Sequence, residues 1–211
     1  MKKCILAIVA VQVFATAAQA DLFFDDFESD LSAWVGKSGT PGSHHGSIVT
    51  DPLDGSNQVL TFTQTNLGGD IFATAVGFDL APGRQYTVSF RYLGDPTQGG
   101  TAGDLGGYAG LSAGFPGTHI WYYGTNTVSG AAPVLIDDGR WRSYSYSFTT
   151  PLGIGNPIHL MFEDFWASGY NLEDVAGDVY FDDVRFVPVP GAVLLGVLGL
   201  SAAGVRLRRR A

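Results

Sequence analysis

Aromatic residues are the side chains of this sequence that are best suited to hold a ligand. Trp166 and Tyr170 stand in a stretch with glycine and asparagine that predicts a loop, and Trp121 and Tyr123 share one face of a predicted strand. Aromatic rings stack on the apolar faces of sugar rings, while the polar tips of Trp and Tyr still hydrogen-bond. We take these four residues as candidate saccharide contacts. Packing in a core is the competing interpretation for each of them.

Catalytic patterns are present but incomplete. The segment 110–114, Gly-Leu-Ser-Ala-Gly, precedes Asp137 and His159 in an order that a catalytic triad allows. Such a nucleophile elbow joins a strand to a helix, and nothing in this sequence predicts the helix. A glycosidase needs two carboxylates across a groove, whereas Glu163 and Asp164 are adjacent and would point to opposite faces of a strand. We therefore expect no catalytic residues and no enzyme.

Two carboxylates close the last predicted strand. If Val184 and Phe186 face the core, strict alternation places Asp182 on that same face and Asp183 outside. A buried carboxylate is costly unless it is paired, hydrogen-bonded or bound to a metal. Asp182 should therefore cap a turn, accept backbone hydrogen bonds or bind a cation.

Net charge excludes one large class of partner. The chain carries a net charge of −8, but half of its 12 basic residues lie at its two ends. Residues 21–187 hold 6 basic and 20 acidic residues, a net charge of −14. Nucleic-acid binding depends on Lys and Arg that neutralise phosphates, so nucleic acid is excluded as a partner. The single cysteine, Cys4, precludes a disulfide within the chain.

The elements that must position these residues are strands. Apolar residues between 21 and 187 recur with period two, most clearly over 86–92, and Gly, Pro, Asn and Asp separate about eight to ten such runs. This pattern predicts an all-β fold, a two-sheet antiparallel β-sandwich of the jelly-roll type. The glycine-rich stretch 94–117 predicts a long loop. We assign Trp34 and Trp141 to the core.

The first 20 residues predict a secretory signal peptide. Two lysines precede the apolar run 4–18, and Ala18-Gln19-Ala20 supplies the small residues of a cleavage site after Ala20. Signal peptidase is then a partner and the chain is exported. An uncleaved N-terminal anchor is the alternative.

The last 25 residues predict a short membrane helix. The apolar stretch 191–205 would rise about 22 Å as a helix, and flanking residues could extend it toward the width of a bilayer. Four arginines follow directly, which places that end in the cytoplasm and the body outside. These are Arg206, Arg208, Arg209 and Arg210.

This tail resembles the PEP-CTERM sorting signal of exported proteins from Gram-negative bacteria that build extracellular polysaccharide. The resemblance rests on Pro188, Val189 and Pro190, then the helix and the arginine cluster, and Val189 stands where the motif usually has Glu. It implies that an exosortase-type membrane peptidase cuts near the prolines. The protein would be anchored in the inner membrane first and reach the cell surface or the extracellular space afterwards. A permanent anchor is the alternative.

The body resembles the carbohydrate-binding-module superfamily with a galactose-binding-like jelly roll. The resemblance rests on the segments 24–28, 80–90, 141–144 and 180–184, above all Pro-Gly-x-x-Tyr-x-x-Ser-Phe and the closing Asp-Asp-Val. It implies sugar binding. It also implies one structural calcium ion held by Glu28 and Asp182, and calcium favours such oxygen ligands.

The sequence thus predicts three parts: a signal peptide over 1–20, a carbohydrate-binding-module-like sandwich over 21–186 and a sorting signal over 187–211. We expect an exported, non-catalytic protein that binds or accompanies extracellular polysaccharide and meets the membrane through its C-terminal helix before processing. One alternative is a structural coat or biofilm protein that acts by self-association. A less favoured one is an exported polysaccharide hydrolase or lyase.

Overall fold

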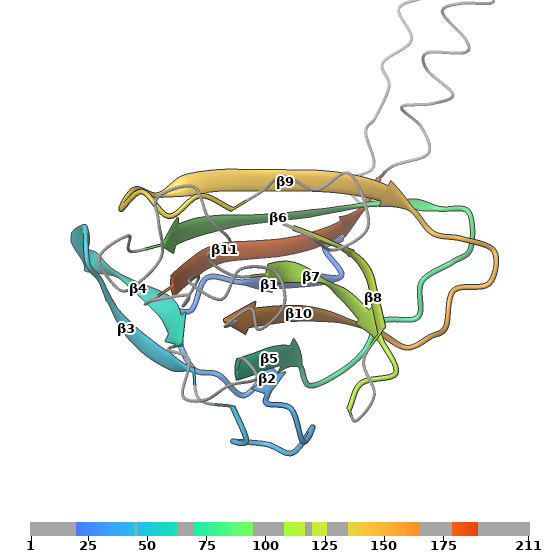
Figure 1. Ribbon diagram of the computed structural model, residues 1–211, viewed down its shortest axis with the longest axis horizontal. Helices are drawn as coiled ribbons and strands as arrows, with labels where there is room; N and C mark the ends of the chain where they lie inside the picture. Colours follow the sequence, from blue (N-terminus) through green and yellow to red (C-terminus); the bar gives the residue numbers. More distant parts are fainter. Residues whose placement is uncertain are drawn as a thin grey trace, which may run out of the picture. The chain divides into compact units, whose positions relative to one another are not determined.

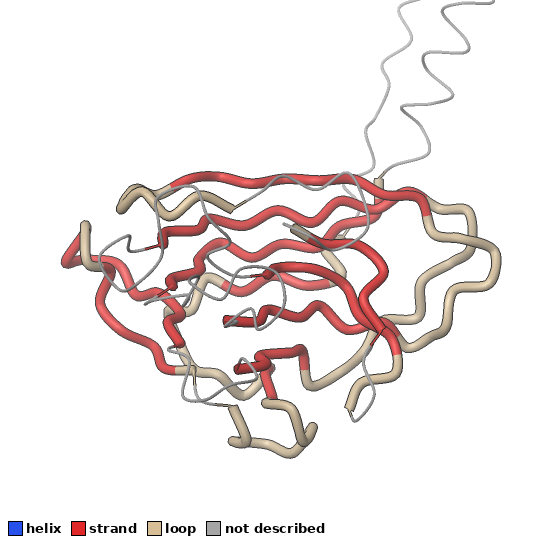
Figure 2. The backbone as a smooth tube through the Cα atoms, in the orientation of Figure 1, coloured by secondary structure: helices blue, strands red, loops and turns tan. Residues whose placement is uncertain are grey.

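The protein folds as strands joined by turns and loops (Figures 1 and 2). The computed structural model describes residues 20–44, 46–62, 70–94, 108–116, 120–125, 135–164 and 179–189. They belong to one compact unit over Ala20–Val189. No helix among these residues is long and apolar enough to cross a membrane. Ala20 and residues 187–189 are described, but the rest of the predicted signal peptide and sorting signal lies outside the described residues.

Two antiparallel sheets make up this unit, which confirms the predicted all-β two-sheet sandwich. Sheet A has the strand order β3 (Ser47–Asp51), β4 (Asp54–Phe62), β11 (Val179–Pro188), β6 (Gln85–Gly94) and β9 (Arg142–Thr149), and β1 (Phe23–Asp25) also pairs with β11. Sheet B has the order β2 (Trp34–Val35), β5 (Asp70–Thr74), β10 (Ile158–Asp164), β7 (Tyr108–Ala113) and β8 (Ile120–Gly124).

Strand β7 corrects one sequence-based expectation. It lies inside the stretch 94–117 that predicted a loop, and its small residues pair with β10 on one side and β8 on the other. Leu111 and Ala109 of β7 are buried in the core. Glycine content therefore masked a strand whose partners, rather than its own propensity, keep it extended.

Aromatic rings fill the core between the two sheets. Trp34 is buried as predicted, with its ring centroid 4.7 Å from that of Phe72. Phe162 of β10 stacks on Phe181 of β11 at 4.4 Å, which joins sheet B to sheet A. Full burial of such a side chain stabilises the fold by roughly 1.5–3 kcal/mol.

A bulge interrupts β11 next to Asp182 and Asp183. Asp182 pairs with Arg91 and Arg185 pairs with Ser89, so that two residues of β11 lie opposite the single residue between them on β6. Phe181 and Val184, three residues apart, are therefore both buried in the core. The prediction that Asp182 shares a face with Val184 is wrong, because alternation breaks at the bulge and Asp182 points to the outer face of sheet A.

The outer face of sheet B carries a second apolar cluster, beside the buried polar pair Ser112 and His159. Val35, Ile71, Ala73, Phe115 and Met161 form a second buried cluster there. Met161 is buried on this side while its neighbours Leu160 and Phe162 are buried in the main core. The exposed polar side chains of the two long strands β6 and β9 lie instead on the outer face of sheet A.

Candidate functional site

Asp182 is the centre of a polar network on the outer face of sheet A. Its side chain is 3% exposed. Its Oδ2 accepts hydrogen bonds from Nη1 of Arg91 at 2.9 Å and from Nδ2 of Asn57 at 3.1 Å, and its Oδ1 accepts one from the backbone N–H of Asp183 at 2.8 Å. Strands β4, β6 and β11 are adjacent in sheet A, which is why residues far apart in sequence meet here.

Asn57 joins this centre to a second buried carboxylate. Its Nδ2 lies 3.3 Å from Oδ2 of Asp51, while Oδ1 of Asp51 accepts hydrogen bonds from Nε1 of Trp141 at 3.0 Å and from the backbone N–H of Leu53 at 2.8 Å. Every carboxylate oxygen of Asp51 and Asp182 thus has a donor. The donors come from β4, β6 and β11, from Leu53 between β3 and β4, and from Trp141 just before β9.

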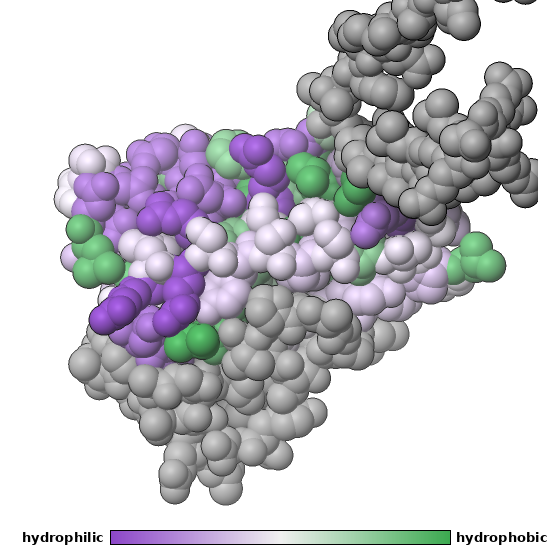
Figure 3. All heavy atoms as spheres, turned by 90° about the horizontal axis from the view of Figure 1, so that it is seen from above, coloured by the Kyte–Doolittle hydropathy of each residue, from purple (hydrophilic) through white to green (hydrophobic). Residues whose placement is uncertain are grey.

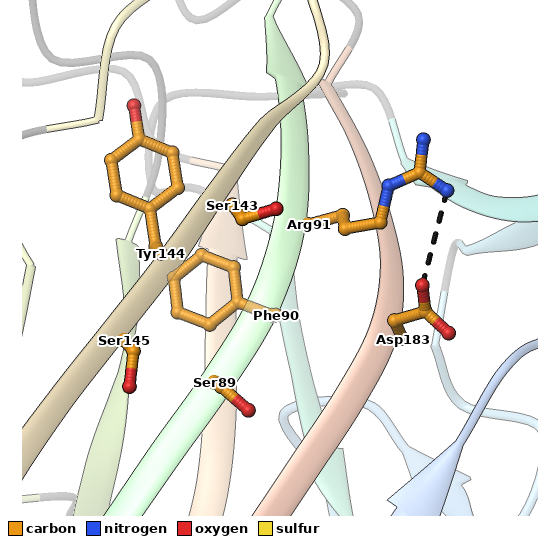
Figure 4. A pocket seen from close by; sticks show the side chains of 7 residues that line it. All are labelled: Ser89, Phe90, Arg91, Ser143, Tyr144, Ser145 and Asp183. Carbon is orange, nitrogen blue, oxygen red and sulfur yellow. Dashed lines mark ion pairs between the residues drawn. The ribbon is translucent and has the colours of Figure 1, made fainter.

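Arg91 is held on three sides. Besides its bond to Asp182, its Nη1 lies 3.9 Å from Oδ2 of Asp183, and its guanidinium carbon lies 4.6 Å from the ring centroid of Trp141. Figure 4 shows Arg91 reaching from β6 toward Asp183 of β11. Trp141 is therefore on the outer face and partly exposed, not in the core as its sequence position had suggested.

An open depression lies beside this network. It has a volume of about 290 Å³ and is lined by Ser89, Phe90, Arg91, Ser143, Tyr144, Ser145 and Asp183 (Figure 4). The rings of Phe90 and Tyr144 stack on each other at 5.7 Å and are buried in the core, which fixes this part of β6 and β9. Seen from the side of β9, most of the described surface is polar, with a few separate apolar residues (Figure 3).

The pKa values of the two buried carboxyl groups are shifted in opposite directions. Burial raises the pKa of Asp182 above its ordinary value, and the hydrogen bonds from Asn57 and the Asp183 N–H offset this only in part. Burial also acts on Asp51, but the hydrogen bonds from Trp141, Leu53 and Asn57 outweigh it and lower the pKa of that carboxyl. Asp182 is thus the more costly charge of the pair.

The contacts of Glu28 and Asp182 do not fit a calcium ion. Oε1 of Glu28 accepts a hydrogen bond from the backbone N–H of Gln58 at 3.0 Å, and both oxygens of Asp182 face donors, one of them the cationic Arg91. No cluster of three His, Cys, Asp or Glu residues within the described ranges could hold a metal ion. Calcium binding stays a prediction.

The predicted saccharide contacts are only partly described. Tyr123 is half-buried, stacks on Phe148 at 4.6 Å and donates its hydroxyl to the carbonyl of Thr149 at 3.1 Å, so one of its faces is taken up by the core. Trp121 pairs through its backbone with Ser112 in β8 and β7. Trp166 and Tyr170 lie outside the described residues.

Ser112 and His159 are direct cross-strand partners of β7 and β10, but the hydrogen bonds of Ser112, His159 and Asp137 lead to other groups. Ser112 is in the middle of strand β7, and its hydroxyl is directed to the carbonyl of Ala113 at 3.3 Å. His159 Nδ1 pairs with the carbonyl of Thr74 at 2.7 Å, and Oδ1 of Asp137 accepts a hydrogen bond from the hydroxyl of Tyr92 at 2.6 Å. This geometry contains no nucleophile elbow, which agrees with the rejection of the pattern from the sequence.

Sequence reasoning missed Arg91, Asn57 and Trp141. Arg91 and the serines of β9 were visible only as the polar half of two alternating strands. The available signal was the alternation itself: in two neighbouring strands of one sheet, polar positions on the same face form one surface. Which strands are neighbours could not be read from the chain.

Comparison with known proteins identifies the fold. No family model and no curated protein matches the chain. Among solved structures, the chain is similar to the C-terminal family 22 carbohydrate-binding module of Xyn10B from Clostridium thermocellum, with 10% identity, a TM-score of 0.51, and coverage of 81% of this chain and 96% of that one.

Two further solved structures are similar to this chain over a comparable range. A tandem of family 22 modules from Xyn10C of Paenibacillus barcinonensis gives 18% identity and a TM-score of 0.51 over 81% of this chain and 50% of that one. A structure described as a xylan-binding domain from family 22 gives 10% identity and a TM-score of 0.51 over 82% and 96%.

Some matching chains are much longer. The chain spans 29% of one that joins the CBM22-1 and GH10 modules of the Clostridium thermocellum xylanase, and 20% of a tailspike protein of bacteriophage CBA120. The isolated modules, by contrast, are matched over nearly their whole length. At these identities the likeness shows the fold alone, and the described body of this chain has the β-sandwich fold of family 22 carbohydrate-binding modules.

Proposed function

We propose that residues 21–186 form a non-catalytic module that binds extracellular polysaccharide, with xylan-like chains as the first class to test. The observation that carries this proposal is the match of the sandwich to whole carbohydrate-binding modules, one of which is described as xylan-binding. Fold alone does not give function. The aromatic candidates support the same assignment.

The proposed contacts are the aromatic residues singled out from the sequence. Trp121, Trp166 and Tyr170 would supply stacking platforms, and Tyr123 would contribute through the part of its side chain that the core leaves exposed. Aromatic anchors of this kind carry much of the binding energy in protein interfaces.

Export and sorting belong to the same proposal. Signal peptidase would remove residues 1–20, and an exosortase-type peptidase would cut the tail near Pro188–Pro190, which delivers the module to the cell surface or the extracellular space. Pro188 is the last residue of β11, and the N–H of Val189 still bonds the carbonyl of Gln85 at 2.8 Å. Mass spectrometry of the protein from its producer should find both ends removed; an intact tail would favour the permanent anchor.

Affinity electrophoresis of the full chain in mild detergent tests the binding. Soluble arabinoxylan and mixed-linkage glucan in the gel should retard the wild type, and heat-denatured protein is the control. Truncation of one stacking anchor, Trp166→Ala or Tyr170→Ala, should weaken binding roughly tenfold, as for a residue worth about 1.4 kcal/mol. No retardation by any neutral or acidic polysaccharide would refute the proposed function.

A further inference from the structure

Among the described residues, the serine hydroxyls of the depression have no hydrogen-bond partner, unlike the hydroxyls of the neighbouring cross-strand pair. Ser89 and Ser145 are direct cross-strand partners of β6 and β9, and Ser143 pairs with Arg91. In the described contacts none of these three hydroxyls makes a hydrogen bond. On the next rung Thr87 and Ser147 bond each other at 2.7 Å. The depression therefore presents three hydroxyls that can both donate and accept.

The charged groups of the depression are already matched to each other. Arg91 is tied to buried Asp182 and lies over Trp141, and it could not turn to a ligand without leaving a buried carboxylate unpaired. Asp183, half-exposed, stands 3.9 Å from Arg91. Arg91 faces two carboxylates, so the local net charge is negative. The other nearby arginine, Arg185 of β11, is paired with Asp21 at 3.4 Å. A sugar that carries its own carboxylate would be repelled here.

Size and shape limit the ligand further. Ligand pockets commonly have volumes of about 300–1,000 Å³. This depression of about 290 Å³ is at the lower end and is open to solvent. It suits one ring of a chain that lies across the strands, not an enclosed small molecule. Its base is fixed because Phe90 and Tyr144 are anchored in the core.

We propose that this depression on the outer face of sheet A is a binding site for one uncharged, hydroxyl-rich sugar ring of a polysaccharide, separate from the aromatic contacts. The inference rests on the proposed function, since it assigns that binding a second site and a charge preference. The serines supply hydrogen bonds that suit sugar hydroxyls, and Asp183 accepts from a sugar hydroxyl while it disfavours acidic sugars.

Matched substitutions on β9 test the site. Ser145→Arg fills the depression, whereas Ser147→Arg places the same side chain on the same face two residues away and outside it. In the full chain, S145R should lower the affinity for neutral arabinoxylan at least fivefold more than S147R does. Far-UV circular dichroism and the melting temperature check that both variants are folded. Equal affinities of S145R and S147R would overturn the site.

A charge series separates this inference from the proposed function. The probes are hydroxyethylcellulose and carboxymethylcellulose, which share one backbone, each at low and at physiological salt. The neutral polymer should bind more tightly, and Asp183→Asn should narrow the gap roughly two- to fivefold, the range of one exposed charge interaction. Asn tolerates the positive φ of this position. Asp79→Asn, an exposed acid outside the depression, is the control for overall charge.

Each outcome has one meaning. Binding lost on Trp166→Ala but unchanged in S145R overturns the second site and leaves the proposed function standing. Tighter binding of the acidic polymer, or equal effects of D183N and D79N, overturns the charge preference. Failure of every polymer to bind refutes the proposed function and, with it, this inference.

Discussion

Two tyrosines of the core differ in the hydrogen bonding of their hydroxyls. Tyr146 is buried with no hydrogen-bond partner for its hydroxyl, and burial raises the pKa of that group far above its usual range. Tyr92 is also buried, but its hydroxyl donates a hydrogen bond to Asp137 at 2.6 Å. A buried polar group without a partner costs roughly 1–3 kcal/mol.

Tyr146→Phe should therefore stabilise the fold, and Tyr92→Phe should weaken it. Each substitution removes one oxygen, so packing is nearly matched between them. We expect the free energy of unfolding in urea to rise by about 1 kcal/mol for Y146F and to fall by about 1–3 kcal/mol for Y92F. A loss of stability in Y146F would show that its hydroxyl has a partner.

Asp182 makes stability depend on pH. Burial raises its pKa above the ordinary 3.8, so the folded chain holds this proton more tightly than the unfolded chain does. The contribution of Asp182 to stability is therefore present below the unfolded pKa and is lost as the pH rises through the folded value. Asp182→Asn does not titrate. Urea unfolding between about pH 3 and 7 should show D182N gaining stability relative to the wild type as the pH rises. The opposite trend would mean that Arg91 outweighs burial.

At the residue scale, the need of a side chain for a hydrogen-bond donor could be predicted from the sequence, but the residues that supply the donor could not. The cost of a buried carboxylate correctly indicated that Asp182 needs a donor or a cation. The donors are Arg91, 91 residues away, and Asn57, 125 residues away. Nothing local to Asp182 names them, because cross-strand neighbours depend on sheet order and register. For the same reason Trp141 was assigned to the core.

At the element scale, the bulge in β11 determines the directions in which the side chains of Asp182 and Asp183 point. Asp183 has a φ of 50°, in the left-handed region. Asp183→Gly should leave the free energy of unfolding within about 0.5 kcal/mol of the wild type, because Gly adopts this region at no steric cost. Asp183→Val should lower it by about 1–3 kcal/mol, because a β-branched residue is strained there.

Ser89→Val is the matched control for that prediction. Ser89 lies on the neighbouring strand β6 and is not among the described residues with positive φ, so valine should be tolerated there. Chemical denaturation of the three variants measures the comparison. Equal losses in D183V and S89V would mean that side-chain burial, and not backbone conformation, is responsible.

Periodicity predicted strands more reliably than their irregularities. The alternating runs around 86–92 and 158–162 are β6 and β10. The same rule misplaced Asp182, because one extra residue at a bulge reverses every assignment on one side of it. It also missed β7, because glycine and alanine residues contribute little to an alternating apolar pattern.

At the scale of the whole molecule, stability should not depend on calcium. The domain has a large aromatic core, and its buried acids have protein donors. The melting temperature of the full chain should therefore be unchanged by a chelator or by millimolar calcium. A ligand that binds only the native state at a hundredfold excess over Kd adds about 2.7 kcal/mol, which a melt resolves easily. A rise with calcium that the chelator reverses would support the calcium site predicted from the sequence.

The position of β11 fixes when the domain can fold. This strand, the last of the described strands, lies between β4 and β6 in sheet A and also pairs with β1, the first of them. Until residue 188 has emerged from the ribosome, sheet A lacks its centre and β1 lacks its partner. Contacts this distant in sequence form slowly. A nascent chain of this topology therefore lacks the complete sheet A until β11 has been synthesised.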